Sequence, residues 1–310
     1  MRGRTLFVLQ KIERKAKMIK VIASDMDGTL LANDGKIKEK TLTSMYKAMK
    51  AGIRFILVTG RGPNGVAQAL NYEEFQCDRV LWGGAAVSNF NNEIILQKVL
   101  SFDICQKVFE ILRQYPVCVR FSSYPQDYFV GDEEEIQNGL IEHTRLFFVK
   151  ESKERIRNTE VYKTLTNQTE RLDDIRELKK KEVPIYKILV NSNQKEVLDK
   201  VERTLTEEID RIYISSSFSD NLEITAYNAR KGPVLLEYIE SLGYKKEEVL
   251  VFGDSRNDFS MLSMDFGATV AMGNAEPEIK KISKYVTKTN EECGVAYVIE
   301  KIIKRKDSII

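Results

Sequence analysis

Two carboxylates lie close together in the sequence, at the point where an apolar run ends. Asp25 and Asp27 follow the apolar residues 21–23, and Gly28 and Thr29 come directly after them. Residues two apart on a strand point to the same face, so both acids can face one small volume at the strand tip. Two anions this close repel each other unless a cation or a shared proton is present. The string therefore indicates a nucleophile, a proton shuttle and a metal ion.

The two acids are expected to have different tasks. Asp25 is the expected nucleophile, because a carboxylate that attacks phosphorus forms an aspartyl-phosphate when a metal neutralises the charge. Asp27 is the expected acid and base, which protonates the leaving oxygen and then takes a proton from the hydrolytic water. Gly28 allows a sharp bend in the chain, and Thr29 is expected to support the turn rather than to react.

Two further apolar runs end in a polar residue, Thr59 in one case and Asp254 in the other. Ligands of an open parallel sheet bind beyond the carboxyl ends of its strands, so these residues are expected to converge with Asp25. Thr59, Gly60 and Arg61 offer a hydroxyl and backbone N–H groups to phosphate oxygens. The alternative for Thr59 is that a strand simply ends there in a turn-forming polar residue.

A lysine and the string that ends at Asp258 complete the candidate site. Lys231 opens a helical pattern and supplies a compact positive charge for phosphoryl transfer, with its neighbour Arg230 as a rival. Asp254, Asn257 and Asp258 fall together on a strand-to-helix turn. The alternative for Asp258 is a helix cap, which is compatible with a role at a metal.

The composition favours magnesium as the metal. The chain of 310 residues has a single histidine, His143, which excludes a site built from several histidines. A hard ion held by oxygen is expected instead, most simply Mg2+. Mg2+ keeps several waters and takes few carboxylates, so Asp25, Asp254 and a backbone carbonyl near Asp27 would suffice.

The bulk properties exclude several classes of partner. A net charge of +2 gives no electrostatic case for nucleic acid or membrane partners. Four widely spaced cysteines without a C-x-x-C pair indicate reduced thiols and a cytoplasmic protein. No apolar run reaches the roughly 18 residues of a membrane span. Residues 1–17 are basic around a short apolar patch, and we expect a disordered or non-essential extension before Met18.

The pattern of apolar residues predicts an α/β fold with an insertion. Strands are expected at 19–24, 55–58, 80–82, 249–252 and 268–271, with helices at 38–50, from Pro63, at 234–242, from Phe259, at 276–282 and at 295–303. This alternation is typical of a parallel sheet with crossover helices. Residues 90–225 differ, with helices expected at 104–115 and 197–205, paired strands at 117–121 and 128–130, a strand at 185–190 and a hairpin at 212–224. They indicate an inserted α+β unit.

The combination of motifs resembles one known family. The matching strings are Ser24-Asp-Met-Asp-Gly-Thr-Leu-Leu31, Val58-Thr-Gly-Arg61, Lys231-Gly-Pro, Gly253-Asp-Ser-Arg-Asn-Asp258 with Met261-Leu262, Ala271-Met-Gly-Asn-Ala275 and Gly294-Val-Ala296. They resemble the haloacid dehalogenase-like superfamily of phosphohydrolases. More narrowly, they resemble its Cof-like branch (subclass IIB), which carries a large α+β cap of the C2 type between the second and third motifs.

The resemblance implies a Rossmann-like catalytic core, a cap that selects the substrate, and a Mg2+-dependent phosphatase. The core is expected at residues 18–88 and 223–310, and the cap at 89–222. The implied catalytic residues are Asp25 and Asp27. The implied phosphate-binding positions are Met26, Thr59, Gly60, Lys231 and Asn257. The implied metal site comprises Asp25, Asp27 through its backbone carbonyl, Asp254, Ser255 and Asp258, the last in an outer position or orienting Lys231.

The chain departs from the pattern of this branch at three places. Gly83-Gly84 stands where Asn-Gly is usual, which removes an amide near the phosphate or the leaving group. Asn228 replaces a glycine, and Cys293 replaces a residue that is often acidic. None of these touches the nucleophile, so the reaction class is expected to be kept while the substrate preference is open.

The expected substrate is a small phosphorylated metabolite: a sugar phosphate, a nucleotide or a cofactor phosphate. The alternatives are a phosphomutase acting on a sugar phosphate and a non-catalytic regulator that binds a phosphorylated metabolite. The protein is expected to be a monomer or a homodimer. Several cap residues have the polarity to hold a ligand, although each is more simply a surface or packing residue: Tyr124, Asp127, Tyr128, His143, Arg145 and Lys187.

Overall fold

The computed structural model describes residues 19–70, 75–145, 151–217 and 220–307. The chain folds into two compact units: a core unit formed by the residues up to 96 and from 230 onward, and an insert unit formed by residues 97–229. The expected extension at residues 1–17 lies outside the described residues. Two units were expected from the sequence, with boundaries after residues 88 and 222. The boundaries in the structure lie several residues later, after 96 and 229.

Strand pairing explains the shift of both boundaries. After β3 (Asp78–Leu81), the chain adds β4 (Ala86–Ser88) and β5 (Ile94–Gln97) to the core sheet, a hairpin that the sequence analysis missed. At the other boundary, β11 (Asn221–Ala226) pairs along its length within the sheet of the insert unit. Residues 89–96 therefore belong to the core unit, and residues 223–229 to the insert unit.

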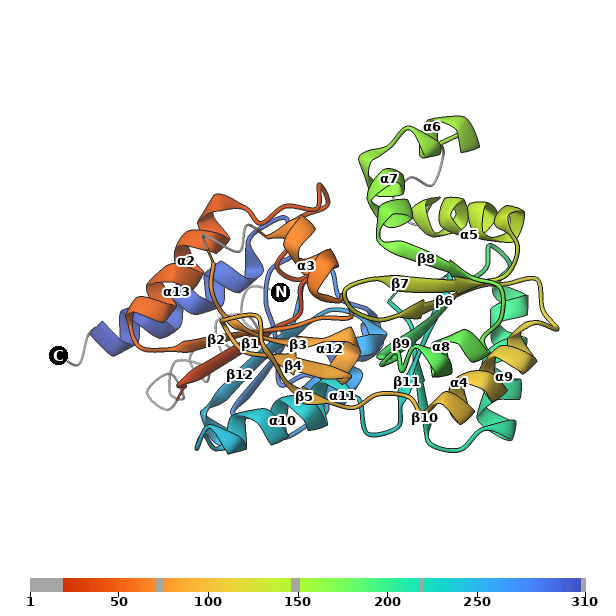
Figure 1. The fold of residues 1–310 in the computed structure, drawn as a ribbon. Helices are drawn as coiled ribbons and strands as arrows, with labels where there is room; N and C mark the ends of the chain where they lie inside the picture. Colours follow the sequence, from red (N-terminus) through yellow and green to blue (C-terminus); the bar gives the residue numbers. More distant parts are fainter. Residues whose placement is uncertain (1–18, 71–74, 146–150, 218–219, 308–310) are drawn as a thin grey trace. The chain divides into compact units, whose positions relative to one another are not determined.

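The core unit is built on an eight-stranded sheet (Figure 1). Its strand order is β14 (Tyr285–Val286), β13 (Ala268–Ala271), β12 (Val249–Gly253), β1 (Val21–Ser24), β2 (Arg54–Val58), β3, β4 and β5. The pairs from β14 through to β3 are parallel, and β4 runs antiparallel to β3. The short central strands are apolar at almost every position and fully buried, as expected for a parallel sheet covered on both faces.

Helices cover the two faces of this sheet. On one face α2 (Glu39–Lys50) packs against α13 (Gly294–Asp307), and on the other α10 (Lys231–Ser241) packs against α11 (Phe259–Leu262) (Figure 1). Gly52 follows the end of α2 with a φ of 75°, the left-handed conformation that glycine adopts after a helix. Proline begins both α3 (Pro63–Ala69) and α12 (Pro277–Ile282), where its missing N–H costs nothing.

The order of the strands places a topological switch point between β1 and β12. From β1 the chain moves outward through β2 and β3, and after the insertion it moves the other way from β12 through β13 and β14. Open α/β sheets bind their ligands at such a point, beyond the carboxyl ends of the strands. Asp25 and Asp254 are the residues that directly follow β1 and β12.

The insert unit has a six-stranded sheet in the order β10 (Ile212–Ser215), β11, β9 (Lys187–Asn191), β6 (Cys118–Ser122), β7 (Asp127–Val130) and β8 (Thr169–Leu172). The pairs are antiparallel except for β7 with β8. The hairpin of β10 and β11 and the pairing of β6 with β7 were expected, whereas β8 was missed. The remaining helices are α4 (Phe102–Leu112), α5 (Glu133–Arg145), α6 (Lys153–Arg157), α7 (Glu160–Asn167), α8 (Arg176–Lys180) and α9 (Lys195–Glu208).

The strands of the insert sheet alternate between an apolar and a more polar face. Phe121 and Ile188 lie opposite each other on the apolar face, and Phe121 makes an edge-to-face contact with Phe109 of α4. On the other face Phe129 packs with α5, α6 and α7 in a small apolar cluster. This face also carries charged residues, among them Lys187 and Glu223.

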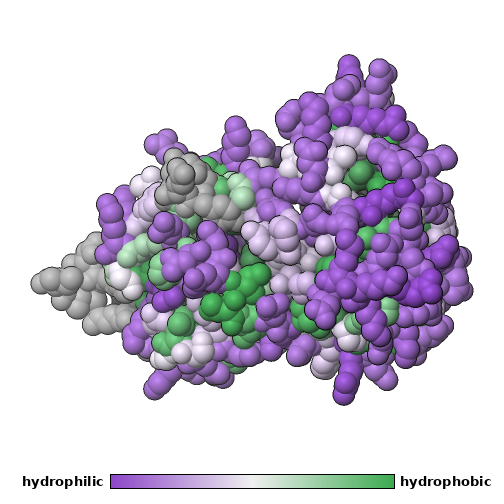
Figure 2. Space-filling view, in the orientation of Figure 1, coloured by the Kyte–Doolittle hydropathy of each residue, from purple (hydrophilic) through white to green (hydrophobic). Residues whose placement is uncertain are grey.

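No helix among the described residues is both long and apolar enough to cross a membrane. The face of the molecule in Figure 2 is covered largely by hydrophilic side chains.

Candidate active site

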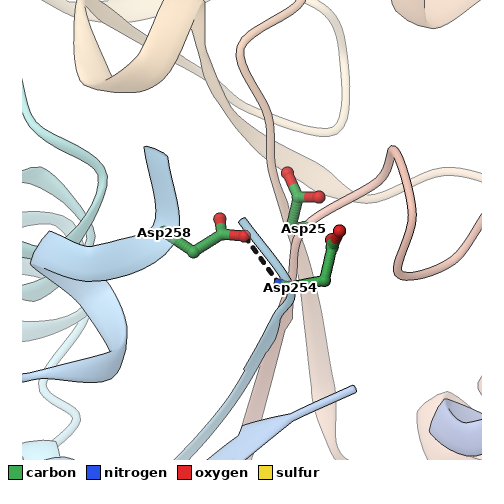
Figure 3. A group of neighbouring side chains, drawn as sticks. All are labelled: Asp25, Asp254 and Asp258. Carbon is green, nitrogen blue, oxygen red and sulfur yellow. Dashed lines mark hydrogen bonds between the residues drawn. The ribbon is translucent and has the colours of Figure 1, made fainter. Parts of the chain in front are cut away.

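The nucleophile predicted from the sequence lies at the tip of β1, between two parallel neighbours. Ser24 is in register with Phe252 of β12 and with Leu57 of β2. The N–H of Asp25 donates to the carbonyl oxygen of Phe252 at 3.1 Å, which extends the pairing one residue beyond the strand. The backbone of Asp25 is therefore fixed by the sheet, and Figure 3 shows its carboxylate beside that of Asp254.

Lys231 connects Asp25, the predicted nucleophile, to the string that ends at Asp258. Its side chain is 1% exposed, and Nζ donates to Oδ1 of Asp25 at 2.7 Å, to Oδ1 of Asn257 at 2.9 Å and to Oδ1 of Asp258 at 2.7 Å. An ammonium group has three N–H donors, and all three are used here. Burial alone lowers the pKa of Lys231, but the charges of Asp25 and Asp258 outweigh burial and raise it well above its usual value. The lysine is therefore a permanent countercharge for two carboxylates.

Asp258 holds the loop that carries Asp254. Its second oxygen, Oδ2, accepts a hydrogen bond from the backbone N–H of Asp254 at 2.9 Å (Figure 3). It also accepts one from the backbone N–H of Ser255 at 3.2 Å. The carboxylate of Asp258 is fully buried, and both of its oxygens are already engaged. Asp258 thus acts as the cap that its position in the sequence suggested, and it also orients Lys231.

The crowding of carboxylates changes their acidity. The pKa of Asp25 is raised well above its usual range, mainly by burial and then by repulsion from Asp258, against the opposing attraction of Lys231. Burial raises the pKa of Asp254 to about 7, and repulsion from Asp258 contributes in the same direction. Both carboxyl groups lie where a negative charge is unfavourable unless a further cation is bound.

The donor set fits a divalent hard cation. One oxygen each from Asp25, Asp254 and Asp258 lies within 4.8 Å of the others. Because both oxygens of Asp258 are engaged by N–H donors, Asp25 and Asp254 are the carboxylates best placed to bind an ion directly. A pair of carboxylates with water in the remaining positions is the set that Mg2+ usually takes.

Gly28 and Thr29 lie in the loop that follows β1 and position the carboxylate of Asp254. Gly28 has a φ of 74°, and a Cβ atom at this position would overlap the carboxylate of Asp254. Thr29 Oγ1 donates to Asp254 Oδ1 at 2.7 Å. Thr29 is therefore not only a turn support, because its hydroxyl fixes the rotation of the Asp254 carboxylate and leaves Oδ2 facing the Gly28 backbone.

Asp27, the predicted acid and base, is held by an arginine. Arg61 donates through Nε to Asp27 Oδ2 at 2.9 Å and through Nη2 to Asp27 Oδ1 at 2.6 Å. Arg61 is itself fixed by a hydrogen bond from Nη1 to the carbonyl oxygen of Gly65 at 3.0 Å. A two-pronged pair of this kind fixes both the distance and the plane of the carboxylate.

The fold and this constellation agree with the comparisons with known proteins. A family model described as haloacid dehalogenase-like hydrolase matches residues 22–299. The chain belongs to the haloacid dehalogenase-like hydrolases. The match spans most of the chain and includes both segments of the core unit as well as the insert.

Individual relatives refine this assignment. YcsE of Bacillus subtilis, a 5-amino-6-(5-phospho-D-ribitylamino)uracil phosphatase, is 26% identical over 291 residues, which cover 93% of this chain and 97% of that protein. A haloacid dehalogenase-like hydrolase from B. subtilis has a solved structure that matches with a TM-score of 0.77 at 24% identity, over 91% of this chain and 99% of the other.

A third match is the structure of the subclass IIB sugar phosphatase BT4131, with a TM-score of 0.71 at 20% identity over 94% of this chain and all of the other. The chain is a member of the Cof-like branch and a phosphoric monoester hydrolase. The insert unit is the cap of this haloacid dehalogenase-like hydrolase.

The remaining predicted phosphate-binding residues lie in the same core unit. Thr59 is fully buried, and its Oγ1 accepts the N–H of Arg61 at 3.1 Å. Asn257 Oδ1 accepts from both Lys231 and Ser255, the latter at 3.1 Å, so its NH2 group is directed away from the lysine. Met26 is buried and its carbonyl oxygen accepts N–H groups within the turn that follows. The binding of phosphate by these residues and by Gly60, and of metal by Ser255, stays a prediction.

Two consecutive glycines lie beside the lysine. Gly83 has a φ of 69°, with no atom within 4 Å of the position that a Cβ atom would take. Gly84 has a φ of 111°, and a Cβ atom there would come within 2.6 Å of the backbone of Arg230, the residue before Lys231. The N–H of Gly83 donates to the carbonyl oxygen of Thr59 at 2.9 Å. The glycine pair thus lies between Thr59, which follows β2, and Arg230, which precedes α10.

The cap residues considered in the sequence have different environments. Tyr124 is exposed and Tyr128 is buried, while the side chains of His143 and Arg145 lie outside the described part of the structure. Lys187 is buried and forms an ion pair with Glu223 at 3.4 Å. Their environments in the insert unit were not predictable from single-residue patterns.

Three contacts of the core unit were not predicted from the sequence. They are the ion pair of Arg61 with Asp27, and the hydrogen bonds that Asn274 and Asn290 make to the loop that follows β1. Asn274 Nδ2 donates to the carbonyl oxygen of Gly28 at 2.8 Å. The only available signal was that Asn274 belongs to a motif string without an assigned task. Asn290 belongs to no such string, and nothing in the sequence indicates its partner.

Proposed function

We propose that this enzyme is a Mg2+-dependent phosphatase that hydrolyses monoesters of small phosphorylated metabolites through an aspartyl-phosphate on Asp25. The observation that carries the proposal is the largely buried cluster of Asp25, Asp254 and Asp258 with Lys231, in which three carboxylates lie together and the lysine pairs with only two of them, Asp25 and Asp258. Such a cluster has an anionic surplus that a divalent ion offsets. When bound, Mg2+ would offset the negative charge of the phosphate and of Asp25.

In the first half-reaction, a carboxylate oxygen of Asp25 attacks phosphorus and the bond from phosphorus to the leaving oxygen breaks. The leaving oxygen takes a proton from Asp27. Lys231 keeps the carboxylate of Asp25 in one rotation throughout, because its ammonium group is fixed from two other sides. This arrangement already holds Asp25 in position when the substrate binds, which lowers the entropic cost of attack.

In the second half-reaction, a water attacks the phosphorus of the aspartyl-phosphate and gives its proton to Asp27. The bond between phosphorus and Asp25 breaks, and inorganic phosphate leaves. The Arg61 pair presents Asp27 as a hydrogen-bond acceptor, which is the form that the second half-reaction needs. To act as the acid, Asp27 must break at least one of its two hydrogen bonds with Arg61.

We propose that the substrate is a sugar phosphate, a nucleotide or a cofactor phosphate. YcsE, named for a phosphorylated ribityl compound, and BT4131, named as a sugar phosphatase, support a small organic phosphate as the substrate class. A cytoplasmic location completes the proposal and is supported by four cysteines that form no disulfide bonds.

The test is release of inorganic phosphate from a panel of phosphate monoesters, with Mg2+ and with a chelator. Hexose and pentose phosphates, nucleoside monophosphates, flavin mononucleotide and pyridoxal 5′-phosphate represent the proposed classes. We expect turnover that needs Mg2+ and is abolished in Asp25→Asn. Turnover that survives in Asp25→Asn would refute the aspartyl-phosphate, and an isomerised substrate without free phosphate would indicate a mutase.

A further inference from the structure

The turn after β13 contains a motif string, Ala271 to Ala275, to which the reaction assigns no task. Within it, Asn274 is exposed, yet its side chain makes two hydrogen bonds. Nδ2 donates to the carbonyl oxygen of Gly28 at 2.8 Å, and Oδ1 accepts the N–H of Asn290 at 2.9 Å. An exposed asparagine that uses both ends of its amide on backbone groups of two other segments acts as a connection between them.

The orientation of this amide is unambiguous. The carbonyl oxygen of Gly28 can only accept, and the backbone N–H of Asn290 can only donate. Asn274 must therefore direct its NH2 group to Gly28 and its oxygen to Asn290. The side chain of Asn290 reaches the same loop, because its Nδ2 donates to the carbonyl oxygen of Leu31 at 2.9 Å.

The same turn also holds the second acid-bearing loop. The N–H of Glu276 donates to the carbonyl oxygen of Asp254 at 2.9 Å. Gly28 directly follows Asp27, and Glu276 is two residues after Asn274. One short turn is thus bonded to the loop that carries Asp25 and Asp27 and to the loop that carries Asp254.

We infer that Asn274 is a positioning residue, which with Asn290 sets the spacing between the two carboxylate-bearing loops. Asn274 acts through the backbone and touches no reacting atom. The inference rests on the proposed function for its consequence in catalysis, since Mg2+ requires near-ideal octahedral geometry. Loss of the hydrogen bond from Asn274 to Gly28 lets the loop that follows β1 move relative to Asp254. Groups outside the direct ligands commonly affect metal affinity or activity by about 10–100-fold.

The experiment compares Asn274→Ala and Asn274→Asp with wild type. Alanine removes both bonds, whereas aspartate keeps the acceptor for Asn290 and loses the donor to Gly28. Asn158→Asp is the matched control, because Asn158 is also exposed and also donates from Nδ2 to a backbone carbonyl, that of Glu154 at 3.1 Å. Asn290→Ala is a second, independent variant that removes the bond from Nδ2 to Leu31 and keeps the backbone N–H that donates to Asn274.

Three readouts are needed: Mg2+ affinity by calorimetry, amide hydrogen exchange of residues 26–31, and kcat with KM on the best substrate of the panel. We expect both Asn274 variants to bind Mg2+ about 10–100-fold more weakly, to exchange faster at 26–31 and to lose kcat more than they change KM. Asn290→Ala should show the same pattern, and Asn158→Asp should match wild type.

Wild-type Mg2+ affinity and wild-type exchange at 26–31 in a folded Asn274→Ala variant would overturn the inference, whatever its activity. If Asn274→Ala does not fold, a folded Asn274→Asp variant with wild-type values in both readouts would overturn it equally. A wild-type enzyme without turnover on the panel would refute the proposed function instead. The metal and exchange readouts would then still decide the inference.

Discussion

The Nζ atom of Lys231 lies 2.7 Å from Oδ1 of Asp25, although 206 positions separate the two residues in the chain. Both side chains are almost completely buried. Asp25 comes from the segment before the insertion and Lys231 from the segment after it, so this bond joins the two halves of the core unit. The position of Asp25, the proposed nucleophile, therefore depends on the correct assembly of both halves.

Replacement of Lys231 by methionine should destabilise the protein as well as inactivate it. Methionine leaves Asp25 and Asp258 buried without their shared countercharge, and breaking a buried ion pair by removing one partner costs about 3–5 kcal/mol. Denaturant unfolding of the metal-free protein measures this loss. Lys195→Met is the control, because the Lys195–Asp199 pair is exposed and such pairs contribute about 0–1 kcal/mol. Equal stability of the two variants would contradict the prediction.

The two hydrogen bonds from Arg61 to Asp27 should increase the rate of proton transfer, because they position the acid and base. Asp27→Asn should lower kcat by about 10²–10⁴-fold, the usual contribution of a positioned acid and base. Arg61→Lys keeps the charge but loses the two-pronged geometry, so it should lower kcat less and change the pH profile of kcat.

A matched control for Arg61→Lys exists on the surface of the insert unit. Arg176 also contacts both carboxylate oxygens of one residue, Asp174, and is exposed. Arg176→Lys should leave kcat and its pH profile unchanged. A pH profile of Arg61→Lys identical to that of wild type would show that the pair does not position Asp27.

The sequence was sufficient to predict the elements that carry the acids, because each is an apolar run with a polar end. Asp25, Thr59 and Asp254 follow buried parallel strands, and the pattern of a parallel sheet requires their tips to meet at one edge. The hydrogen bonds that fix them were not predictable in the same way. Arg61 is two residues beyond a strand, in a turn whose direction depends on tertiary packing.

The parts that were missed share a physical cause. The strands β4, β5 and β8 are only three or four residues long, which leaves periodicity little to separate them from loops, although the equally short β1 was predicted from its apolar run. Trp82 was expected to continue a strand but has a φ of 47°, because the chain turns there to bring Gly83 to Thr59. Such turns are set by contacts distant in sequence, which a single chain does not display.

The glycine pair beside Lys231 should respond very differently to substitution at its two positions. Gly84→Ala places a Cβ atom against the backbone of Arg230 and forces a strained φ, so it should displace Lys231 and reduce both stability and kcat. Gly83→Asn should fold with a stability change of about 1 kcal/mol or less, because asparagine tolerates the left-handed region and nothing occupies the space. Thermal unfolding and kcat of both variants check this. A Gly84→Ala variant as stable and active as Gly83→Asn would contradict it.

The buried pair of Lys187 and Glu223 in the insert unit should show strong coupling. Burial lowers the pKa of Lys187 despite the attraction of Glu223. Lys187→Met alone leaves the buried carboxylate of Glu223 without its cation, with the Ser217 hydroxyl still donating to it, and should cost about 3–5 kcal/mol, whereas adding Glu223→Leu should recover part of that loss. Unfolding of the two single variants and the double variant measures the coupling. Additive losses would show that the two charges do not depend on each other.

The raised pKa of Asp254 predicts how pH and Mg2+ act on stability. Burial, with repulsion from Asp258, raises this pKa from 3.8 to about 7. Between these values the folded metal-free protein holds a proton that the unfolded chain has lost. The stabilisation is therefore complete below pH 3.8 and is lost as the pH rises through about 7. Mg2+ needs the deprotonated carboxylate, so its affinity increases over the same range.

The difference in Tm with and without Mg2+ should accordingly widen from about pH 5 to about pH 8. Asp254→Asn cannot titrate and should show little difference at any pH, while Asp210→Asn, at an exposed position, should behave as wild type. A Mg2+ effect on Tm that is as large at the lower pH as at the higher would be incompatible with a protonated Asp254 in the metal-free protein.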